Sequence, residues 1–566
     1  MSDFEFERIN TIKGYPELHW TGKRPYRGTD YYPAQLKEKY GEIKDDWINK
    51  IFWGDNLQVM SHMLREYRGK IDLIYIDPPF DSKADYKMKI ELKGKQVKND
   101  NSSFEEKQYT DIWSNDEYLQ FMYERIILLR ELLKNEGSIF IHCDWHKSHY
   151  IRMIADEIFG KDNLRNEIAW IYTGPGSPGM RQFNRKHDTI LWYSKSDQWT
   201  FNSDEIRIPS EVHVGGFNND MGKEESSQYA EKGKIPEDWW EFAVAARRKI
   251  DGCERSGYPT EKPMNLVERI IKACSNPGEI VFDCFMGGGT TPAVAMKNGR
   301  KFIGADINLG AIQLTTKRLL NIGKKIEKKD DKYTGFEVYN VNNYDFFRNP
   351  IEAKDLLIDA LGIQKFNENN IYDGELDGRM VKIMPVNRIA TKSDLEELKV
   401  NLPYQKFEKR KNDNPLEPVE KITIVCMGHE PDLKPSLEQD LNNYNIDIEI
   451  LDVLKDKTNL QFKRESEAVI EMKNNKLIVK EFYPMNLLQK LSIQKEYVED
   501  WKQMVESIMI DWNYDGAVME PEEIDIAEKD NLVKGIYEIP KNVKWIKIKI
   551  TDLLSETFEK EIRINE

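Results

Sequence analysis

Long apolar runs are missing from this sequence, and cysteine is scarce. No stretch approaches about 18 uncharged apolar residues, so we expect no membrane-spanning helix. The opening residues, MSDFEFERIN, contain no apolar segment, so we expect no signal peptide. The few cysteines lack C-x-x-C spacing, which fits a reducing cytoplasm and argues against a structural zinc site. They are Cys143, Cys253, Cys274, Cys284 and Cys426.

The rest of the composition is that of a globular protein. Of the 566 residues, 40% are hydrophobic and 32% are charged, which excludes a disordered chain and a fibrous repeat. Residues 1–330 hold 50 basic and 51 acidic side chains, whereas residues 331–566 hold 33 and 47. Because a phosphate-binding surface needs local positive charge, the first part is the better candidate for contact with nucleic acid. The acidic second part is more typical of a scaffold or protein-contact region.

Predicted strands alternate with predicted helices over most of the first 330 residues, which is typical of a doubly wound α/β sheet. Strands are predicted at 71–76, 138–145, 167–172, 189–195, 279–285 and 300–307. Helices are predicted at 117–135, 263–274, 291–298 and 309–321. Later segments predict a β-α-β unit over 421–453, a hairpin over 468–482 with an Asn474-Asn475 turn, and a β-rich C-terminal domain.

These patterns divide the chain into five predicted regions. They are an N-terminal arm at 1–50, an α/β domain at 51–330 with a candidate recognition insert at 201–255, an α+β region at 331–416, a small α/β region at 417–490 and a β-rich domain at 491–566. The insert loses the periodicity of its neighbours. The length of the chain predicts about three or four domains, in line with this division.

The first chemical motif is Asp77-Pro78-Pro79-Phe80, which closes a buried strand. Ligands of open α/β sheets bind outside such carboxyl ends. The Asp77 carboxylate and the Pro78 carbonyl can accept both hydrogens of an exocyclic amino group, and Phe80 offers a face for stacking a base. A simple strand-terminating turn explains the tetrapeptide equally well.

The second motif is a tight glycine turn between a strand and a helix, in Asp283-Cys-Phe-Met-Gly-Gly-Gly-Thr290. Glycines allow close backbone approach to a ligand, and the helix N-terminus presents free N–H groups. The next strand ends at Asp306, where a carboxylate can accept from ribose hydroxyls. No G-x-x-x-x-G-K-[ST] sequence is present, which disfavours a P-loop NTPase.

Together the two motifs resemble those of the amino-methylating DNA methyltransferases that use S-adenosylmethionine. The DPPF motif precedes the F-x-G-x-G loop by about 200 residues, which matches the permuted order of the β class. GDN at 54–56, GSIFIHCDW at 137–145, RKHDTILWYSK at 185–195 and YPTEKP at 258–263 resemble further family segments. Within this family the chain looks most like the modification subunits of type III restriction systems.

The resemblance implies a Rossmann-like methyltransferase domain and roles for named residues. Asp77, Pro78, Pro79 and Phe80 would hold the target base. The cofactor would contact Asp55, Asn56, Lys262, Pro263, Asp283, Phe285, Gly287, Gly289, Thr290 and Asp306. Candidate DNA contacts are Arg181, Arg185, Lys186, Trp239 and Trp240, although the two tryptophans equally fit the core of the insert.

The family resemblance favours transfer of a methyl group to adenine N6 in double-stranded DNA. Alternatives are cytosine N4 as the target, a recognition subunit that directs a helicase-nuclease partner, and methylation of RNA or protein. A homodimer is a further possibility. His142, Asp144, His146 and His149 could suggest a metal site, but packing in and beside the sheet is the favoured interpretation, and direct methyl transfer needs no metal.

Overall fold

A computed structural model defines the fold, and every structural statement below concerns the residues that it describes. In the first part these are 4–6, 16–79, 90–92, 95–97, 115–174, 181–209, 232–244, 261–326 and 332–341. In the second part they are 354, 358, 361, 363–366, 371–376, 378–384, 395, 398–400, 402–413, 418–426, 433–441, 443–452, 466–485, 487–488, 491, 498, 500–527 and 531–564. The chain forms two compact units, one of residues 1–342 with 466–566 and one of residues 343–465.

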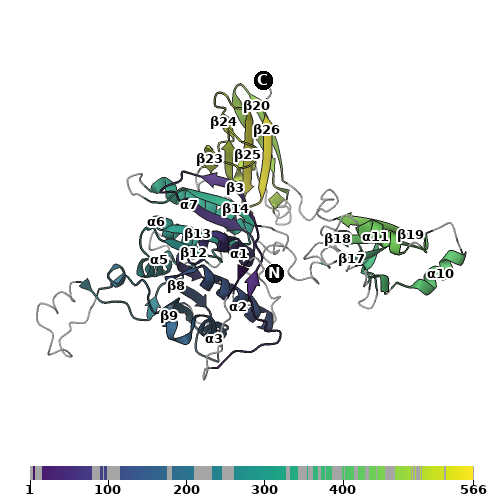
Figure 1. Ribbon diagram of the computed structural model, residues 1–566. Helices are drawn as coiled ribbons and strands as arrows, with labels where there is room; N and C mark the ends of the chain where they lie inside the picture. Colours follow the sequence, from purple (N-terminus) through teal and green to yellow (C-terminus); the bar gives the residue numbers. More distant parts are fainter. Residues whose placement is uncertain are drawn as a thin grey trace, which may run out of the picture. The chain divides into compact units, whose positions relative to one another are not determined.

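The largest element of the first unit is a ten-stranded mixed sheet with the order β11-β9-β10-β8-β5-β12-β13-β4-β14-β3 (Figure 1). Its strands are β3 (Ala34–Tyr40), β4 (Asn49–Trp53), β5 (Ile71–Ile76), β8 (Leu133–Cys143), β9 (Leu164–Ile171), β10 (His187–Ser194), β11 (Trp239–Glu241), β12 (Ile280–Asp283), β13 (Lys301–Asp306) and β14 (Phe336–Val341). The run from β8 to β14 is parallel, whereas β10 and β3 are antiparallel to their neighbours.

Helices cover both faces of this sheet, so the predicted doubly wound architecture is confirmed. Buried side chains of α1 (Asn56–Tyr67), α2 (Asn115–Leu132) and α3 (Ser148–Phe159) belong to one hydrophobic core. Those of α5 (Met264–Cys274), α6 (Thr290–Lys297) and α7 (Leu309–Lys325) belong to a second core on the opposite face (Figure 1). No described helix is both long and apolar enough to span a membrane.

The edges of this sheet differ from the predicted domain boundaries. Residues 34–40, predicted to be part of an N-terminal arm, form β3 and pair with β14. Residues 336–341, predicted to begin a separate region, form β14 and pair with β4. The helix predicted to run to residue 135 ends at Leu132, because β8 begins at the next residue. Hydrophobic pattern alone does not fix such a direct helix-to-strand junction.

Two smaller sheets at the C-terminal end complete the first unit. One contains β20 (Glu467–Lys473), β21 (Lys476–Tyr483) and β24 (Ile536–Glu538), and the other β23 (Glu523–Ile526), β22 (Val505–Asp511), β25 (Trp545–Asp552) and β26 (Thr557–Arg563). The predicted hairpin is confirmed, with positive φ angles of 54° at Asn474 and 58° at Asn475 as a type I′ turn requires. Because β21 also pairs with β24, the predicted boundary at 490 runs through one sheet.

The C-terminal sheets pack against the far edge of the ten-stranded sheet within this unit. The Lys549 ammonium on β25 pairs with the Glu38 carboxylate on β3, across 511 residues of sequence. Although burial opposes ionisation, this ion pair holds the pKa of Glu38 below its ordinary value. On the same side, Lys317 of α7 pairs with Glu506 at 2.7 Å.

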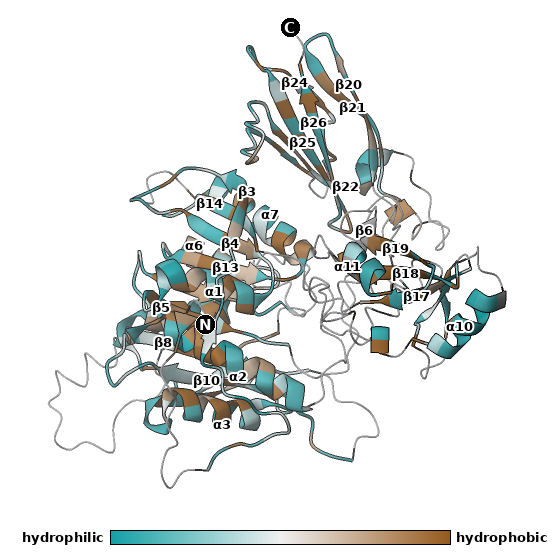
Figure 2. Ribbon diagram, turned by 45° about the vertical axis from the view of Figure 1, so that its right-hand side comes forward, coloured by the Kyte–Doolittle hydropathy of each residue, from teal (hydrophilic) through white to brown (hydrophobic). Residues whose placement is uncertain are grey.

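The second unit is built on a five-stranded sheet of order β15-β16-β17-β18-β19. Its strands are β15 (Gln364–Lys365), β16 (Gly374–Leu376), β17 (Arg379–Ile383), β18 (Glu420–Cys426) and β19 (Ile446–Asp452), and its helices include α10 (Tyr404–Asp413) and α11 (Leu433–Asp440). The predicted β-α-β unit is confirmed as β18-α11-β19 with parallel strands. Figure 2 shows hydrophobic residues along β17, β18 and β19 and hydrophilic residues along α10. Because β17 pairs with β18, the predicted boundary at 416 runs through this sheet.

The first unit also contains shorter elements. They are β1 (Phe4–Glu5) with β2 (Gly28–Thr29), β6 (Ile90–Leu92) with β7 (Lys95–Val97), and single 3₁₀ turns at Lys161–Asn163, Ser203–Ile206 and Trp501–Met504. Of the predicted insert, residues 201–209 and 232–244 are described. Its β11 extends the large sheet by pairing in parallel with β9.

Candidate active site

Three carboxylates lie at neighbouring strand ends of the ten-stranded sheet. Asp77 directly follows β5, Asp283 is the last residue of β12 and Asp306 is the last residue of β13. These strands are adjacent and parallel, so their carboxyl ends meet at one edge. The fold therefore brings the two sequence motifs, which lie far apart in the chain, to one site.

The Asp77 carboxylate uses its two oxygens differently. Oδ2 forms an ion pair with the Lys262 ammonium. Oδ1 is buried and has no hydrogen-bond partner among the described residues. A buried carboxylate oxygen without a partner is unfavourable unless a ligand supplies the missing donor. Pro78 is buried and Pro79 half-buried beside it, while Phe80 lies outside the described residues.

A hydrogen-bonded network lies on the strands that follow β5 in the sheet. His142 of β8 bonds through Nδ1 to the Tyr75 hydroxyl and through Nε2 to Asp188 of β10, each at 3.1 Å. Tyr172 also donates to Asp188 at 3.1 Å. Burial favours the neutral acid, but these bonds and the charge of Lys262 hold the pKa of Asp188 below its ordinary value. Lys262 therefore favours the charged form of Asp188 as well as pairing with Asp77.

The glycine turn is fixed by the two neighbouring strand-end carboxylates. Asp283 accepts the Phe285 N–H at 2.9 Å and the Thr291 hydroxyl at 2.6 Å. Asp306 accepts the Gly287 N–H and the Asn308 N–H, each at 2.9 Å. Gly289 precedes α6 with a φ of 70°, a left-handed conformation that favours glycine. The N-terminus of α6 therefore opens toward the strand ends.

Burial changes the acidity of this cluster. It is the main reason that the pKa of Asp283 rises to about 7; the hydrogen bonds from Thr291 and Phe285 oppose this rise, and the charges of Asp77 and Asp306 contribute to it. Burial also raises the pKa of Asp306 to about 6, although the backbone N–H groups of Asn308 and Gly287 oppose the change. Both groups therefore exchange protons near neutral pH, and a cation placed among them would favour their charged forms.

Asp55 and Asn56 are held by a buried arginine. Asp55 caps α1, because its Oδ1 accepts the Leu57 N–H at 2.9 Å, and its Oδ2 pairs with Arg125 at 3.1 Å. Arg125 also donates to the Asn56 oxygen at 2.5 Å, and Asn56 donates to the Cys284 carbonyl at 3.3 Å. The Asp55 carboxylate is thus engaged in holding α1 against α2, which favours a positioning role over direct cofactor contact.

Helix α7 contributes two residues that the sequence did not single out. Arg318 donates to the Gly288 carbonyl at 2.9 Å and to the Thr290 hydroxyl at 3.2 Å, and it pairs with Glu261 at 2.9 Å. Thr315 donates to the Gly287 carbonyl at 3.2 Å. Neither residue belongs to a recognisable motif, because both lie on a helix whose apolar face explains its pattern.

Comparison with known proteins agrees with this geometry. Residues 71–317 match the family described as DNA methylase. The chain is 30% identical over 270 residues to the DNA adenine methyltransferase YhdJ of Escherichia coli, covering 48% of this chain and 82% of that protein. It is 32% identical over 252 residues to the type II methyltransferase M1.MboII of Moraxella bovis, covering 42% and 85%.

The chain belongs to the DNA methylase family. It is also 28% identical over 290 residues to the type III restriction-modification enzyme EcoPI Mod subunit of Escherichia phage P1. The matched region covers 46% of this methylase and 43% of that protein. Among solved structures, the complex of M1.HpyAVI with SAM is 21% identical and covers 48% of this chain and 98% of that one, with a TM-score of 0.31.

The residues at the strand ends fit the S-adenosylmethionine that methylases of this family use. The three strand-end carboxylates suit its positively charged sulfur, and the glycine turn before α6 suits close approach of the ligand to backbone. A Cβ at Gly289 would lie 2.5 Å from the Thr315 side chain, so the turn has room only for glycine. Gly287, Gly289, Thr290 and Asp306 are therefore the residues that would hold the cofactor.

Three of the predicted cofactor residues, Lys262, Pro263 and Phe285, contact other parts of the site. Lys262 pairs with Asp77. Pro263 caps α5 and is buried. Phe285 is buried against Phe121, with ring centroids 6.2 Å apart. These contacts shape the walls of the site, and they hold Lys262 at the Asp77 carboxylate.

The loop before β10 carries the candidate DNA contacts of this methylase. Arg181 and Arg185 are exposed and Lys186 is half-buried. The Arg185 guanidinium lies 3.6 Å from the centre of the Trp145 ring at the end of β8, where the indole is 43% exposed. Between the arginines, Phe183 is 99% exposed. Sequence patterns did not single out Phe183 or Trp145, although an aromatic residue among basic ones is a usable signal.

The two adjacent tryptophans of the insert have different surroundings. Trp240 is buried in the core, and its indole N–H donates to the Glu237 carbonyl at 2.8 Å. Trp240 therefore cannot stack on a base without leaving the core, which corrects its assignment as a candidate DNA contact. Trp239 is 52% exposed and remains a candidate DNA contact.

Two of the histidines after β5 make hydrogen bonds to neighbouring side chains. His142 bonds to Tyr75 and Asp188, and His146 bonds to Asp144. Within the described ranges, no group of three or more potential ligands could hold a metal ion.

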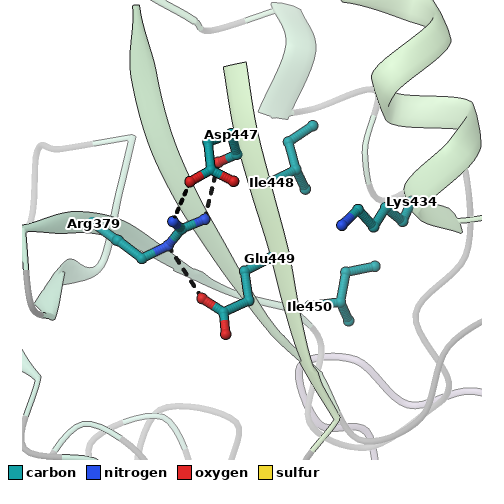
Figure 3. A pocket seen from close by; sticks show the side chains of 6 residues that line it. All are labelled: Arg379, Lys434, Asp447, Ile448, Glu449 and Ile450. Atoms are coloured by element: carbon teal, nitrogen blue, oxygen red, sulfur yellow. Dashed lines mark hydrogen bonds and ion pairs between the residues drawn. The ribbon is translucent and has the colours of Figure 1, made fainter. Parts of the chain in front are cut away.

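The second unit has one notable surface pocket, of about 420 Å³ (Figure 3). Arg379 of β17 lies between two acidic residues of β19, at 2.6 Å from Asp447 and 3.2 Å from Glu449. Lys434 of α11 lines the other side. Both carboxylates are paired, so this pocket lacks the partnerless buried oxygen that marks the Asp77 site.

Proposed function

We propose that this methylase transfers a methyl group from S-adenosylmethionine to N6 of adenine in double-stranded DNA. The partnerless Asp77 Oδ1, buried beside the glycine turn, carries the proposal. An exocyclic amino group is a donor that fits this oxygen, and it is also the nucleophile of the reaction. The name of one relative, the DNA adenine methyltransferase YhdJ, supports adenine as the target.

The residues at the β5 end would prepare the amino group for attack. The Asp77 oxygen accepts one amino hydrogen and the Pro78 carbonyl accepts the other, which favours a tetrahedral nitrogen with an available electron pair. S-adenosylmethionine supplies a methyl group that is bonded to a positively charged sulfur. When the methyl group is transferred, this sulfur leaves as a neutral thioether. As the nitrogen–carbon bond forms and the sulfur–carbon bond breaks, the nitrogen becomes positive, and the Asp77 carboxylate stabilises this charge until the nitrogen loses a proton to water.

Incubating the purified chain with isotope-labelled S-adenosylmethionine and duplex DNA tests this proposal. We expect label in N6-methyladenine after digestion to nucleosides. Label in N4-methylcytosine would instead assign the alternative target, and absence of label from DNA would contradict methyl transfer to DNA.

The pKa values of Asp283 and Asp306 predict a pH-dependent preference for the charged cofactor. Asp306 loses its proton near pH 6 and Asp283 near pH 7. We expect affinity for S-adenosylmethionine to rise between pH 6 and 8, by about tenfold for each pKa unit by which the cation lowers the pKa of Asp283. Affinity for S-adenosylhomocysteine, which has a neutral sulfur, should change less.

Calorimetric titration of both ligands at pH 6, 7 and 8 measures this preference. Equal pH dependence of the two affinities would contradict it. In the free protein the sign for stability is opposite, because the folded state keeps protons that the unfolded chain releases. These two groups therefore favour unfolding as the pH rises from about 4 to about 7.

We further propose that Phe183 enters the base stack when the target base leaves it. A fully exposed phenyl ring between Arg181 and Arg185 fits a segment whose charges bind phosphates while its ring replaces a base. We expect Phe183→Ala to weaken binding to duplex DNA by about tenfold, since stacking on one base contributes about 1–3 kcal/mol.

A matched set of duplexes tests the role of Phe183. The neighbouring Asn184→Ala is the control, because Asn184 is also exposed. The loss in Phe183→Ala should shrink when the target adenine faces an abasic site, since unpairing is then easier. An equal loss on both duplexes would contradict insertion into the stack.

The type III relative supports a role in a restriction system. We infer that this chain modifies host DNA while a separate helicase-nuclease chain would cleave unmodified DNA. Co-purification with a helicase-nuclease chain, and cleavage that requires both chains, would support this role. Full methylation activity with no such partner would assign a solitary methylase.

A further inference from the structure

Two consecutive residues of opposite charge join the two halves of the site. Glu261 pairs with Arg318 at 2.9 Å, and Lys262 pairs with Asp77. Arg318 in turn donates to Gly288 in the glycine turn at 2.9 Å. A chain of charged contacts therefore runs from the cofactor side to the carboxylate that faces the target base.

Both ion pairs are shielded from water. The Arg318 and Glu261 side chains are 9% and 6% exposed, and those of Lys262 and Asp77 are 12% and 17% exposed. Screening is weak at such burial, so each pair fixes its partners more firmly than a surface pair would. The pairs also sit immediately before α5, whose buried face anchors the segment in the core.

The Lys262 contact determines which Asp77 oxygen is available. Because the ammonium holds Oδ2, Oδ1 is left as the buried acceptor with no partner among the described residues. Rotation of the carboxylate would separate the ion pair, so the ammonium selects one orientation. The target amine would meet a carboxylate that is already aligned.

We infer that Glu261 and Lys262 act as a clasp, meaning that this residue pair couples the glycine turn to the orientation of Asp77. The inference rests on the proposed function of Asp77 at the target base. Lys262 is then a positioning residue for the carboxylate, and Glu261 is a positioning residue for Lys262 through Arg318. Cofactor binding at the turn would stabilise the aligned carboxylate, and DNA with its target base extruded would bind more tightly once the cofactor is present.

Substitutions at both residues test the clasp. We expect Lys262→Met to lower kcat by about 100-fold, with little change in affinity for S-adenosylhomocysteine, and Lys262→Arg to restore part of the loss. Glu261→Gln should remove most of the increase in DNA affinity that S-adenosylhomocysteine produces. The control Lys272→Met breaks a 2.9 Å pair with Glu268 on the same α5 helix, where both side chains are partly exposed, and should change neither value.

Circular dichroism first checks that each variant is folded; if Lys262→Met fails this check, Lys262→Gln takes its place. Unchanged kcat in the Lys262 variant used, or an unchanged effect of S-adenosylhomocysteine on DNA affinity in Glu261→Gln, would overturn the clasp. Such a result together with an inactive Asp77→Ala would leave the proposed function standing. An active Asp77→Ala would instead refute the proposed function itself.

Discussion

Asp77→Ala should lower the rate of methyl transfer by about 1000-fold while affinity for S-adenosylhomocysteine stays within about threefold of the native value. The substitution removes the acceptor of one amino hydrogen and the charge that stabilises the developing positive nitrogen, and a single such group contributes about 10²–10³-fold. The glycine turn is held by Asp283 and Asp306, so its structure does not depend on Asp77.

Single-turnover kinetics and calorimetric titration measure the two quantities separately. Asp77→Asn keeps an acceptor oxygen but loses the charge, so we expect an intermediate rate. Asp204→Ala is the control, because it breaks an exposed 2.7 Å pair with Arg207 away from the strand ends. If Asp77→Ala transfers methyl groups at the native rate, the assignment of the target site is wrong.

Gly289→Ala should have the second largest effect, through the cofactor. The new Cβ would lie 2.5 Å from the Thr315 side chain and would occupy a left-handed conformation with a φ of 70°. The conformational strain contributes roughly 1–2 kcal/mol of destabilisation, and the collision must also displace either the turn or α7. We expect affinity for S-adenosylmethionine to fall at least tenfold, because the backbone of the turn moves.

Gly69→Ala is a matched control for the strain alone. Gly69 has a φ of 68° and no atom within 4 Å of an added Cβ. It should lose stability without losing cofactor affinity, as measured by chemical unfolding and by titration. Adding Thr315→Ala to Gly289→Ala removes the colliding methyl and hydroxyl groups and should recover part of the affinity. Equal affinities in the two glycine variants would contradict the role of the tight turn.

The sequence predicts the centre of this fold better than its edges. Ile71–Ile76 has five apolar residues in six positions and is followed by Asp77 and two prolines, so both the strand and its carboxyl end can be predicted. Asn474 and Asn475 predict a type I′ turn because asparagine tolerates the left-handed conformation. Strand β3 escapes prediction, because its alternating charged residues, AQLKEKY, resemble an exposed segment until β14 pairs with it.

The candidate site is predictable only where a motif concentrates its residues. Asp77 and the glycine turn are local patterns, so the sequence reveals them. The contacts of Arg318 with Gly288 and Glu261 join positions that are remote in sequence, and only the packing of α7 brings them together. Exposure likewise distinguishes Trp239 from Trp240, which alternate between the two faces of one strand.

The pairing of Lys549 with Glu38 affects how this chain is synthesised. A ribosome adds about 5–20 residues per second, so roughly 25–100 seconds pass between the two partners. During that interval the outer side of β3 must wait for its covering sheets while the whole second unit is translated. The edge of the large sheet therefore stays uncovered for most of the time that the methylase is being synthesised. We expect chaperone binding, or mispairing with another nascent chain, to occur mainly in this interval.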